Sequence, residues 1–193
     1  TTDTILTAAK HTVGPVVVYF PSYRYAKEIE DRLRSHDDDL PVAMQPRLNK
    51  LDERIAFLEN ALENAKVLLL VLGGSFSEGI DLLGGRVETA ILISPALPEV
   101  NALREARLDN AIEPSRKNAF RTIYQIPGMR KINQAIGRLV RNPGQKATVL
   151  LQGRRFQLPE YRELLDVEYQ DGPVLHDQET VRAWLAEPFS ISS

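Results

Sequence analysis

The stretch K-V-L-L-L-V-L, residues 66–72, runs directly into G-G-S-F-S-E-G-I-D-L, residues 73–82. An unbroken apolar run of this length is typical of a strand buried on both faces of a parallel sheet. Glycines and serines follow its carboxyl end, where open α/β sheets bind ligands. Glycine lets the backbone approach a phosphate or sugar, and the carboxylates of Glu78 and Asp81 could accept a ribose hydroxyl or orient an arginine. A plain glycine turn fits this stretch equally well.

Strand patterns and helix patterns alternate along the rest of the chain, which predicts an α/β domain with a mainly parallel β-sheet flanked by helices. The predicted strands cover residues 16–20, 41–45, 66–72, 87–94 and 147–151, with a weak one at 174–175. Helices are predicted over residues 23–35, 51–65, 99–110, 129–141, 161–165 and 178–186. Residues 112–127 are predicted only as a loop with some helix. Trp184 and Leu185 are expected to dock the last helix on the core.

The stretch N-Q-A-I-G-R-L-V-R, residues 133–141, carries the most distinctive side chains. On a helix, Gln134, Arg138 and Arg141 would lie within about 60° of one another. Two guanidiniums held together suit phosphate oxygens, because each offers a planar fork of donors and stays charged. Gly137, a poor helix residue, indicates close approach by another element or a ligand. The alternative is a solvated basic helix face. The opposite, buried stripe is expected to comprise Ile132, Ile136, Leu139 and Val140.

Ser22 follows the predicted strand at residues 16–20 and precedes a predicted helix. It is a good N-cap residue. Its hydroxyl and the free backbone N–H groups of the helix start could also bind an anion. Capping alone is the simpler interpretation of this serine.

Composition excludes several classes of function. The chain has 193 residues, a formal net charge of −2 and no cysteine, so disulfides, thiolate metal sites and cysteine nucleophiles are absent. Any anion site must be a local patch. There is no apolar run of membrane-spanning length and no signal-peptide pattern. No phosphate loop G-x-x-x-x-G-K-[ST] is present, no acidic pair follows a strand, and the three histidines lack metal-ligand spacing. Neither a metal site nor a self-sufficient NTPase is therefore expected.

Three motifs resemble those of the XPD/DinG family of superfamily 2 DNA helicases. Q-A-I-G-R-L-V-R at residues 134–141 resembles motif VI, and G-G-S-F-S-E-G-I-D at 73–81 resembles motif V. V-V-Y-F-P-S-Y at residues 17–23 resembles motif IV. The motifs stand in the family's order, and the resemblance covers roughly residues 15–165.

The resemblance implies the second RecA-like motor domain of an ATP-dependent DNA helicase, a three-layer fold, over residues 1–166. Residues 167–193 would form a C-terminal tail with a short helix packing on it. ATP and Mg²⁺ would bind between this domain and the first motor domain, which supplies the phosphate loop. An iron–sulfur cluster would belong only to the missing N-terminal part. This chain alone is expected to be inactive, and the parent protein to lie in the cytoplasm and nucleoid, or in the nucleus of a eukaryote.

The resemblance also assigns roles to residues. Arg138 and Arg141 match the motif VI arginines that reach the ATP phosphates. Gln134 and Gly137 would support the ATP site, together with Glu78, Gly79 and Asp81 of motif V. Single-stranded DNA would be contacted through its backbone, which needs no basic net charge. The residues that match positions near the DNA are Ser22, Tyr23, Ser75 and Ser77.

Two features depart from the family pattern. Gln152-Gly153 precede Arg154 and Arg155, where the family often has an aspartate before the arginine pair, and Pro95-Ala96 replace an aromatic next to proline. Two other functions stay open. The domain could be a non-catalytic docking module that contacts repair-complex proteins through its tail. It could also be a nucleotide-sugar or dinucleotide enzyme, although that leaves the arginine helix unexplained.

Overall fold

A computed structural model describes residues 1–73, 76, 82–111, 115–140 and 145–186. One five-stranded sheet forms the centre, in the order β2-β3-β1-β4-β5, and all four strand pairs are parallel. Val16 of β1 lies opposite Val67 of β3 on one side and Thr89 of β4 on the other. The strands are β1 (Val16–Phe20), β2 (Val42–Met44), β3 (Val67–Val71), β4 (Thr89–Ile93) and β5 (Thr148–Gln152).

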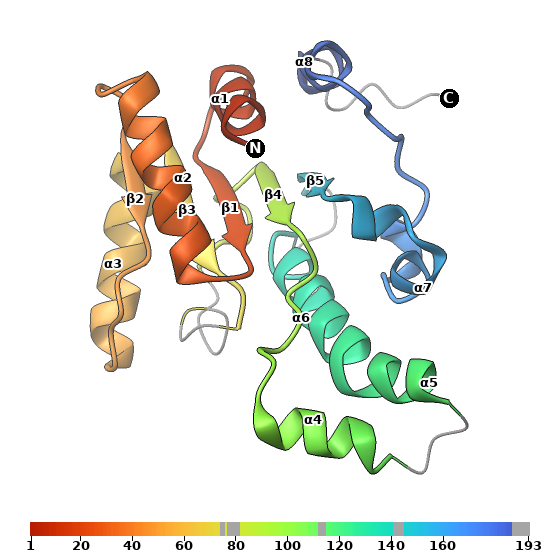
Figure 1. Ribbon diagram of the computed structural model, residues 1–193. Coiled ribbons are helices and arrows are strands. Elements are labelled where there is room, and N and C mark those ends of the chain that lie inside the picture. Colours follow the sequence, from red (N-terminus) through yellow and green to blue (C-terminus); the bar gives the residue numbers. More distant parts are fainter. Residues whose placement is uncertain (74–75, 77–81, 112–114, 141–144, 187–193) are drawn as a thin grey trace.

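Helices cover both faces of the sheet (Figure 1). The α-helices are α1 (Thr2–His11), α2 (Tyr23–His36), α3 (Leu51–Asn64), α4 (Ala102–Asp109), α5 (Arg116–Phe120), α6 (Ile126–Ile136), α7 (Pro159–Arg162) and α8 (Gln178–Ala186). A π-helical turn, η1 (Arg121–Gln125), joins α5 to α6. Two 3₁₀ turns, η2 (Arg154–Gln157) and η3 (Val167–Tyr169), flank α7.

The central strands are apolar on both faces because each face packs against a helical layer. Val16, Val18 and Phe20 of β1 point into a core formed with α1, α2 and α8. Val17 and Tyr19 point into the opposite core, which α3 and α6 cover. All five residues of β1 are buried. The predicted three-layer α/β arrangement is thereby confirmed.

Several local predictions agree with the structure, and others do not. The last helix has the predicted bounds, and Leu185 is buried with Trp184 packed beside it. The α1 helix is not predicted by the sequence. Residues 116–125, predicted only as part of a loop with some helix, are helical throughout. The weak strand predicted at residues 174–175 is wrong, because the described backbone there is irregular.

Candidate functional site

The α6 helix ends earlier than the sequence predicts. Its last helical residue is Ile136, and the N–H of Gly137 donates to the carbonyl of Asn133 over 2.8 Å. A tight turn follows, in which the N–H of Leu139 donates to the carbonyl of Ile136 over 2.9 Å. The prediction of one helix through residue 141 is therefore wrong. Gln134 lies on the helix, whereas Arg138 lies in the turn after it.

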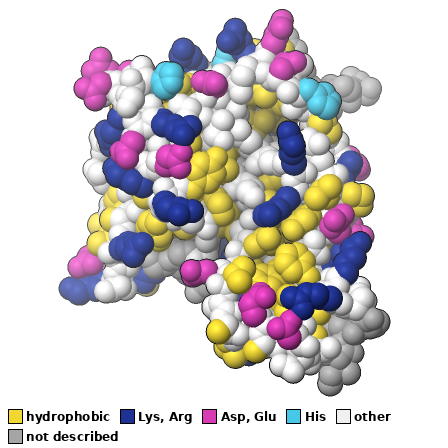
Figure 2. Space-filling model, viewed as in Figure 1, with side chains coloured by type: hydrophobic (Ala, Val, Ile, Leu, Met, Phe, Trp, Pro, Cys, Tyr) yellow, Lys and Arg dark blue, Asp and Glu magenta, His cyan; other side chains and the backbone are white. Residues whose placement is uncertain are grey.

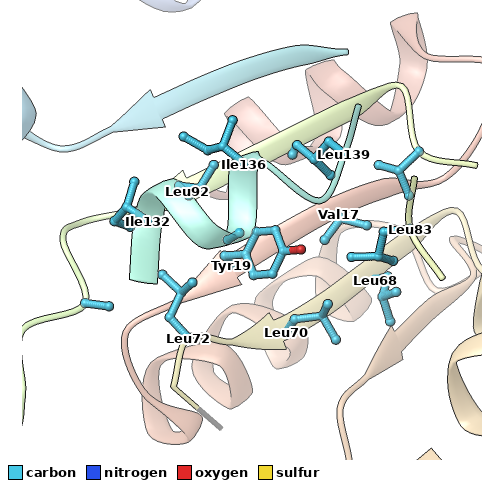
Figure 3. Packing of buried hydrophobic residues seen from close by; sticks show 14 of the residues in the cluster. Val17, Tyr19, Leu68, Leu70, Leu72, Leu83, Leu92, Ile132, Ile136 and Leu139 are labelled. Carbon is cyan, nitrogen blue, oxygen red and sulfur yellow. The ribbon is translucent and has the colours of Figure 1, made fainter. Parts of the chain in front are cut away.

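The predicted buried stripe is correct for three of its four members. Ile132, Ile136 and Leu139 are at most 2% exposed and pack on the sheet (Figure 3). Val140 is 40% exposed, so its predicted burial is wrong. The reason is that the chain leaves the helical path after Ile136, which turns Val140 away from the core.

Gln134 and Arg138 meet in a small pocket between α6 and the end of β3. The pocket has a volume of about 70 Å³, which is room for a small polar group, since roughly 10–15 Å³ on the same measure holds one water molecule. Its polar lining includes Tyr19 and Lys131, and its apolar lining includes Leu70. No described lining residue is acidic. Two cationic side chains, those of Lys131 and Arg138, line the pocket.

Lys131 brings α6 against the start of the glycine loop. Gly73 has a φ of +75°, which glycine adopts without strain. A Cβ atom added there would collide with the ammonium group of Lys131 and lie 3.1 Å from its Cε. The structure thus places the motif VI helix beside the first residue of the motif V loop.

Tyr19 forms the floor of this pocket. Its ring lies between α6 and the neighbouring strand residues Leu70 and Leu72 (Figure 3). Burial raises the pKa of Tyr19 well above its ordinary value, and the positive charge of Arg138 acts in the opposite direction. Tyr19 therefore stays a neutral phenol at physiological pH, and the arginine charge lies close enough to its ring to influence it.

Gly137 does not have the close neighbour that the sequence predicts. Its φ and ψ are −61° and −11°, ordinary for any residue. A Cβ atom there would contact only the carbonyl oxygen of Asn133, at 3.2 Å, among the described atoms. No other described element approaches this glycine, so approach by a ligand is the part of the prediction that stays untested.

Six predicted site residues lie outside the described residues. They are Ser75, Ser77, Glu78, Gly79, Asp81 and Arg141. Phe76, within the same loop, is described and buried, and its ring contacts that of Phe57 edge-on at 5.5 Å.

Ser22 and Tyr23 lie at the carboxyl end of β1, beside the end of β3. Ser22 caps α2, as predicted, by accepting the N–H of Tyr25 over 3.3 Å. The N–H of Leu72 donates to the carbonyl of Phe20 over 2.8 Å. The two residues predicted to contact DNA therefore adjoin the strand that leads into the glycine loop.

Two residues of α6 have roles that the sequence motifs do not indicate. Lys131 lines the pocket, and its spacing of three and seven residues from Gln134 and Arg138 is a helical signal that could have indicated it. Asn133 is structural: its amide donates to the carbonyl of Leu164 and to Asp166 Oδ1, each over 3.0 Å. It ties α6 to the chain after α7.

Figure 2 shows one face of the molecule, on which Lys and Arg side chains alternate with Asp and Glu and no single basic surface forms. Within the described ranges, no helix is long and apolar enough to span a membrane. The same ranges contain no group of three or more His, Asp or Glu side chains placed to hold a metal ion.

The chain is similar over most of its length to known helicase domains. The family model described as Helicase C-terminal domain matches residues 5–171. ATP-dependent DNA helicase CHL1 of Yarrowia lipolytica is 24% identical over 199 aligned residues, covering 88% of this chain and 25% of that protein. ATP-dependent DNA helicase XPD of Sulfolobus acidocaldarius is 29% identical over 148 residues, covering 74% of this chain and 25% of that protein.

Solved structures agree with these relatives. A structure titled XPD helicase aligns with a TM-score of 0.64 and 25% identity, covering 84% of this chain and 29% of that one. A second, titled XPD in the apo form, aligns with a TM-score of 0.65 at 23% identity, covering 84% of this chain and 33% of that one. The RecA-like fold implied by the resemblance is confirmed.

The fold and the three motifs define a motor domain of the superfamily 2 helicase class. The chain belongs to the helicase C-terminal domain family, of the XPD type. It spans about a quarter of the length of each of these two curated relatives.

Proposed function

We propose that this chain is the second motor domain of an ATP-dependent DNA helicase, with ATP bound between it and a first motor domain. The names of the relatives support this, since both CHL1 and XPD are ATP-dependent DNA helicases. The observation that carries the proposal is the convergence of Gln134, Arg138 and Lys131 on one pocket beside Gly73. All three side chains donate hydrogen bonds, and two of them are cationic.

In this proposal Arg138 and Arg141 contact the phosphates of ATP. Charge builds on the phosphoryl oxygens during transfer, and a fixed guanidinium stabilises it; such an arginine contributes roughly a thousandfold or more to the rate. Gln134 would hydrogen-bond within the same site, and Gly137 would leave room for the nucleotide. Glu78, Gly79 and Asp81 would complete the site from the glycine loop. Mg²⁺ would accompany ATP, with its ligands on the first motor domain.

Single-stranded DNA would pass the carboxyl ends of β1 and β3. Ser22 and Tyr23 would contact its backbone from the start of α2, and Ser75 and Ser77 from the glycine loop. The Ser22 hydroxyl accepts a hydrogen bond from Tyr25, which leaves its own proton to donate to a phosphate. Hydroxyl contacts of this kind are independent of DNA sequence. A location with DNA, in the nucleoid or nucleus, follows from this function.

The proposal is tested by measuring ATP hydrolysis with single-stranded DNA for this chain alone, for the first motor domain alone and for the full-length parent. Activity is expected only where both domains are present, because this chain lacks a phosphate loop. ATP hydrolysis by this chain alone would contradict the proposal. So would full activity of the first motor domain without it.

A further inference from the structure

Gln45, immediately after β2, is a buried polar residue that the helicase motifs do not include. It is 2% exposed. Its backbone N–H donates to the carbonyl of Leu69 over 2.9 Å, and its side-chain Oε1 accepts the N–H of Val71 over 2.8 Å. Pro46 follows and cannot donate a ladder hydrogen bond. The glutamine side chain therefore continues the β2–β3 pairing beyond the point where the strand ends.

The other end of the same amide holds Tyr23. Gln45 Nε2 donates to the Tyr23 hydroxyl over 2.6 Å. The phenol thus acts as an acceptor toward the protein, and its own O–H proton has no acceptor within the described part of the chain. One buried side chain therefore fixes both the end of β3, two residues before Gly73, and the tyrosine expected to contact DNA.

Arg47 covers the Tyr23 ring. Its guanidinium carbon lies 4.7 Å from the ring centroid, which is a cation–π contact. The Arg47 side chain is exposed, so its guanidinium can meet a ligand at the protein surface. Within the described ranges Arg47 has no carboxylate within ion-pair distance, and neither does Arg24, the residue after Tyr23.

The surrounding basic residues are neutralised. Farther along α2, Arg32 pairs with Glu28 at 2.6 Å and Arg34 pairs with Glu30 at 3.1 Å. Lys27 lies 2.9 Å from both Glu30 and Asp31. Among the described residues, the arginines without a carboxylate partner near Ser22 are therefore Arg24, at the start of α2, and Arg47, on the Tyr23 ring. The net charge of the whole chain is −2.

We propose that Arg47, stacked on Tyr23, binds a phosphate of single-stranded DNA and that Gln45 is the positioning residue that holds the pair in place. This inference rests on the proposed function. Contact with the ring restricts the motion of the guanidinium, and its planar fork of donors suits two phosphate oxygens. The Tyr23 O–H supplies a neighbouring donor. The contact is to the backbone, so it discriminates little between DNA sequences.

The test measures binding of labelled oligo(dT) and of a mixed-sequence strand to the full-length parent over a range of salt concentrations. Arg47→Ala is expected to lower affinity severalfold for both strands and to reduce the slope of log K against log salt by about 0.7, the value for one phosphate contact on a single strand. Arg47→Lys should keep the slope and recover part of the affinity. Arg182→Ala, which removes an exposed arginine of α8, is the matched control and should leave both unchanged.

Gln45→Leu tests the positioning role. It should weaken binding and reduce the salt slope at least as much as Arg47→Ala does. The losses should be less than additive in the double variant, because both changes remove the Arg47 contact. Gln45→Glu can still accept from Val71 and from Tyr23, so its fold should survive. Additive losses in the double variant would overturn the positioning role.

The outcomes separate this inference from the proposed function. If the wild-type parent binds single-stranded DNA and Arg47→Ala changes neither affinity nor slope, the Arg47 contact is overturned while the proposed function stands. If the wild-type parent does not bind single-stranded DNA at all, both are overturned.

Discussion

Arg138 belongs to a sequence motif, but the residues that surround it in the structure are distant in sequence. It lines a pocket with Tyr19 of β1 and with Gly73 after β3, and its charge influences the phenol of Tyr19. The sequence motif identifies this arginine and its expected ligand. It does not identify Tyr19 or Lys131, because their proximity depends on how α6 packs across the sheet.

Gly137 allows a test at the residue scale. Alanine fits its backbone angles of −61° and −11°, and its Cβ would meet one described atom closely, the carbonyl oxygen of Asn133 one helical turn earlier. Gly137→Ala should therefore change the free energy of unfolding by no more than about 1 kcal/mol. If a nucleotide approaches this backbone, the added methyl group should lower the DNA-stimulated ATPase rate of the full-length parent severalfold. Urea denaturation and steady-state kinetics measure the two effects. Unchanged kinetics would show that the glycine makes no room for ligand.

Gly73 is the contrasting glycine. Its φ of +75° disfavours any other residue, so Gly73→Ala should lower stability by about 1–2 kcal/mol. Comparing the two variants separates a glycine required by backbone conformation from one that would be required by a ligand.

At the scale of elements, the sequence predicts the buried strands best. The strands β1 and β3 are unbroken apolar runs, and such runs indicate strands covered on both faces. The Ser22 cap and the bounds of α8 were also predicted and are confirmed. The end of α6 is not predicted correctly, because a tertiary contact determines it. Leu139 is 1% exposed, and the turn after Gly137 places its side chain in the core.

Other elements carry too weak a local signal to be predicted. The α1 helix buries Ile5, Ala8 and Ala9, and two of these three are small. The Gln45 network joins positions 23, 45 and 71, and no periodicity links positions so far apart. These contacts can be identified only once the three-dimensional structure is known.

The packing of α6 on the segment after β4 gives an element-scale prediction. A Cβ atom at Gly128 would lie 3.2 Å from both the carbonyl carbon and the oxygen of Ala96. Backbone cannot yield easily, so Gly128→Ala should destabilise the domain by about 1–3 kcal/mol, as overpacked cores do. Gly172→Ala, where a Cβ atom meets nothing within 4 Å, is the matched control in urea denaturation. Equal stability of the two variants would contradict the close packing.

The docking of α8 on α1 should depend on pH. Asp177 accepts the N–H of Thr180 over 2.8 Å at the start of α8, and this bond, aided by the Thr180 hydroxyl, lowers the pKa of the carboxyl. A lowered pKa in the folded state means that the stabilisation is present above the unfolded value of about 3.9 and is lost as pH falls through the folded pKa. Detachment of α8 should therefore increase below about pH 4.

Trp184 is the only tryptophan, and it lies on α8, so its fluorescence reports this detachment. Asn caps helices without titrating in this range. Asp177→Asn should therefore reduce the change in Trp184 fluorescence between pH 4 and pH 2. An identical acid transition in both proteins would exclude Asp177 as its source.

At the scale of the whole molecule, the proposed contacts gather where parallel strands end. Gly73 follows β3, Ser22 follows β1, and Gln45 follows β2 and bonds to the end of β3. The helical layer of α6 meets this edge through Lys131. In the proposed function, this edge of the sheet would supply one side of a site that the first motor domain completes.

The most direct measurement is the DNA-stimulated ATPase rate of the full-length parent carrying Arg141→Ala, compared with Arg182→Ala and the unsubstituted protein. If Arg141 stabilises the phosphoryl charge, kcat should fall roughly a thousandfold or more, while circular dichroism and DNA binding stay unchanged and Arg182→Ala keeps full activity. An Arg141→Ala protein with an unchanged kcat would contradict the assignment of this domain as the supplier of arginine fingers.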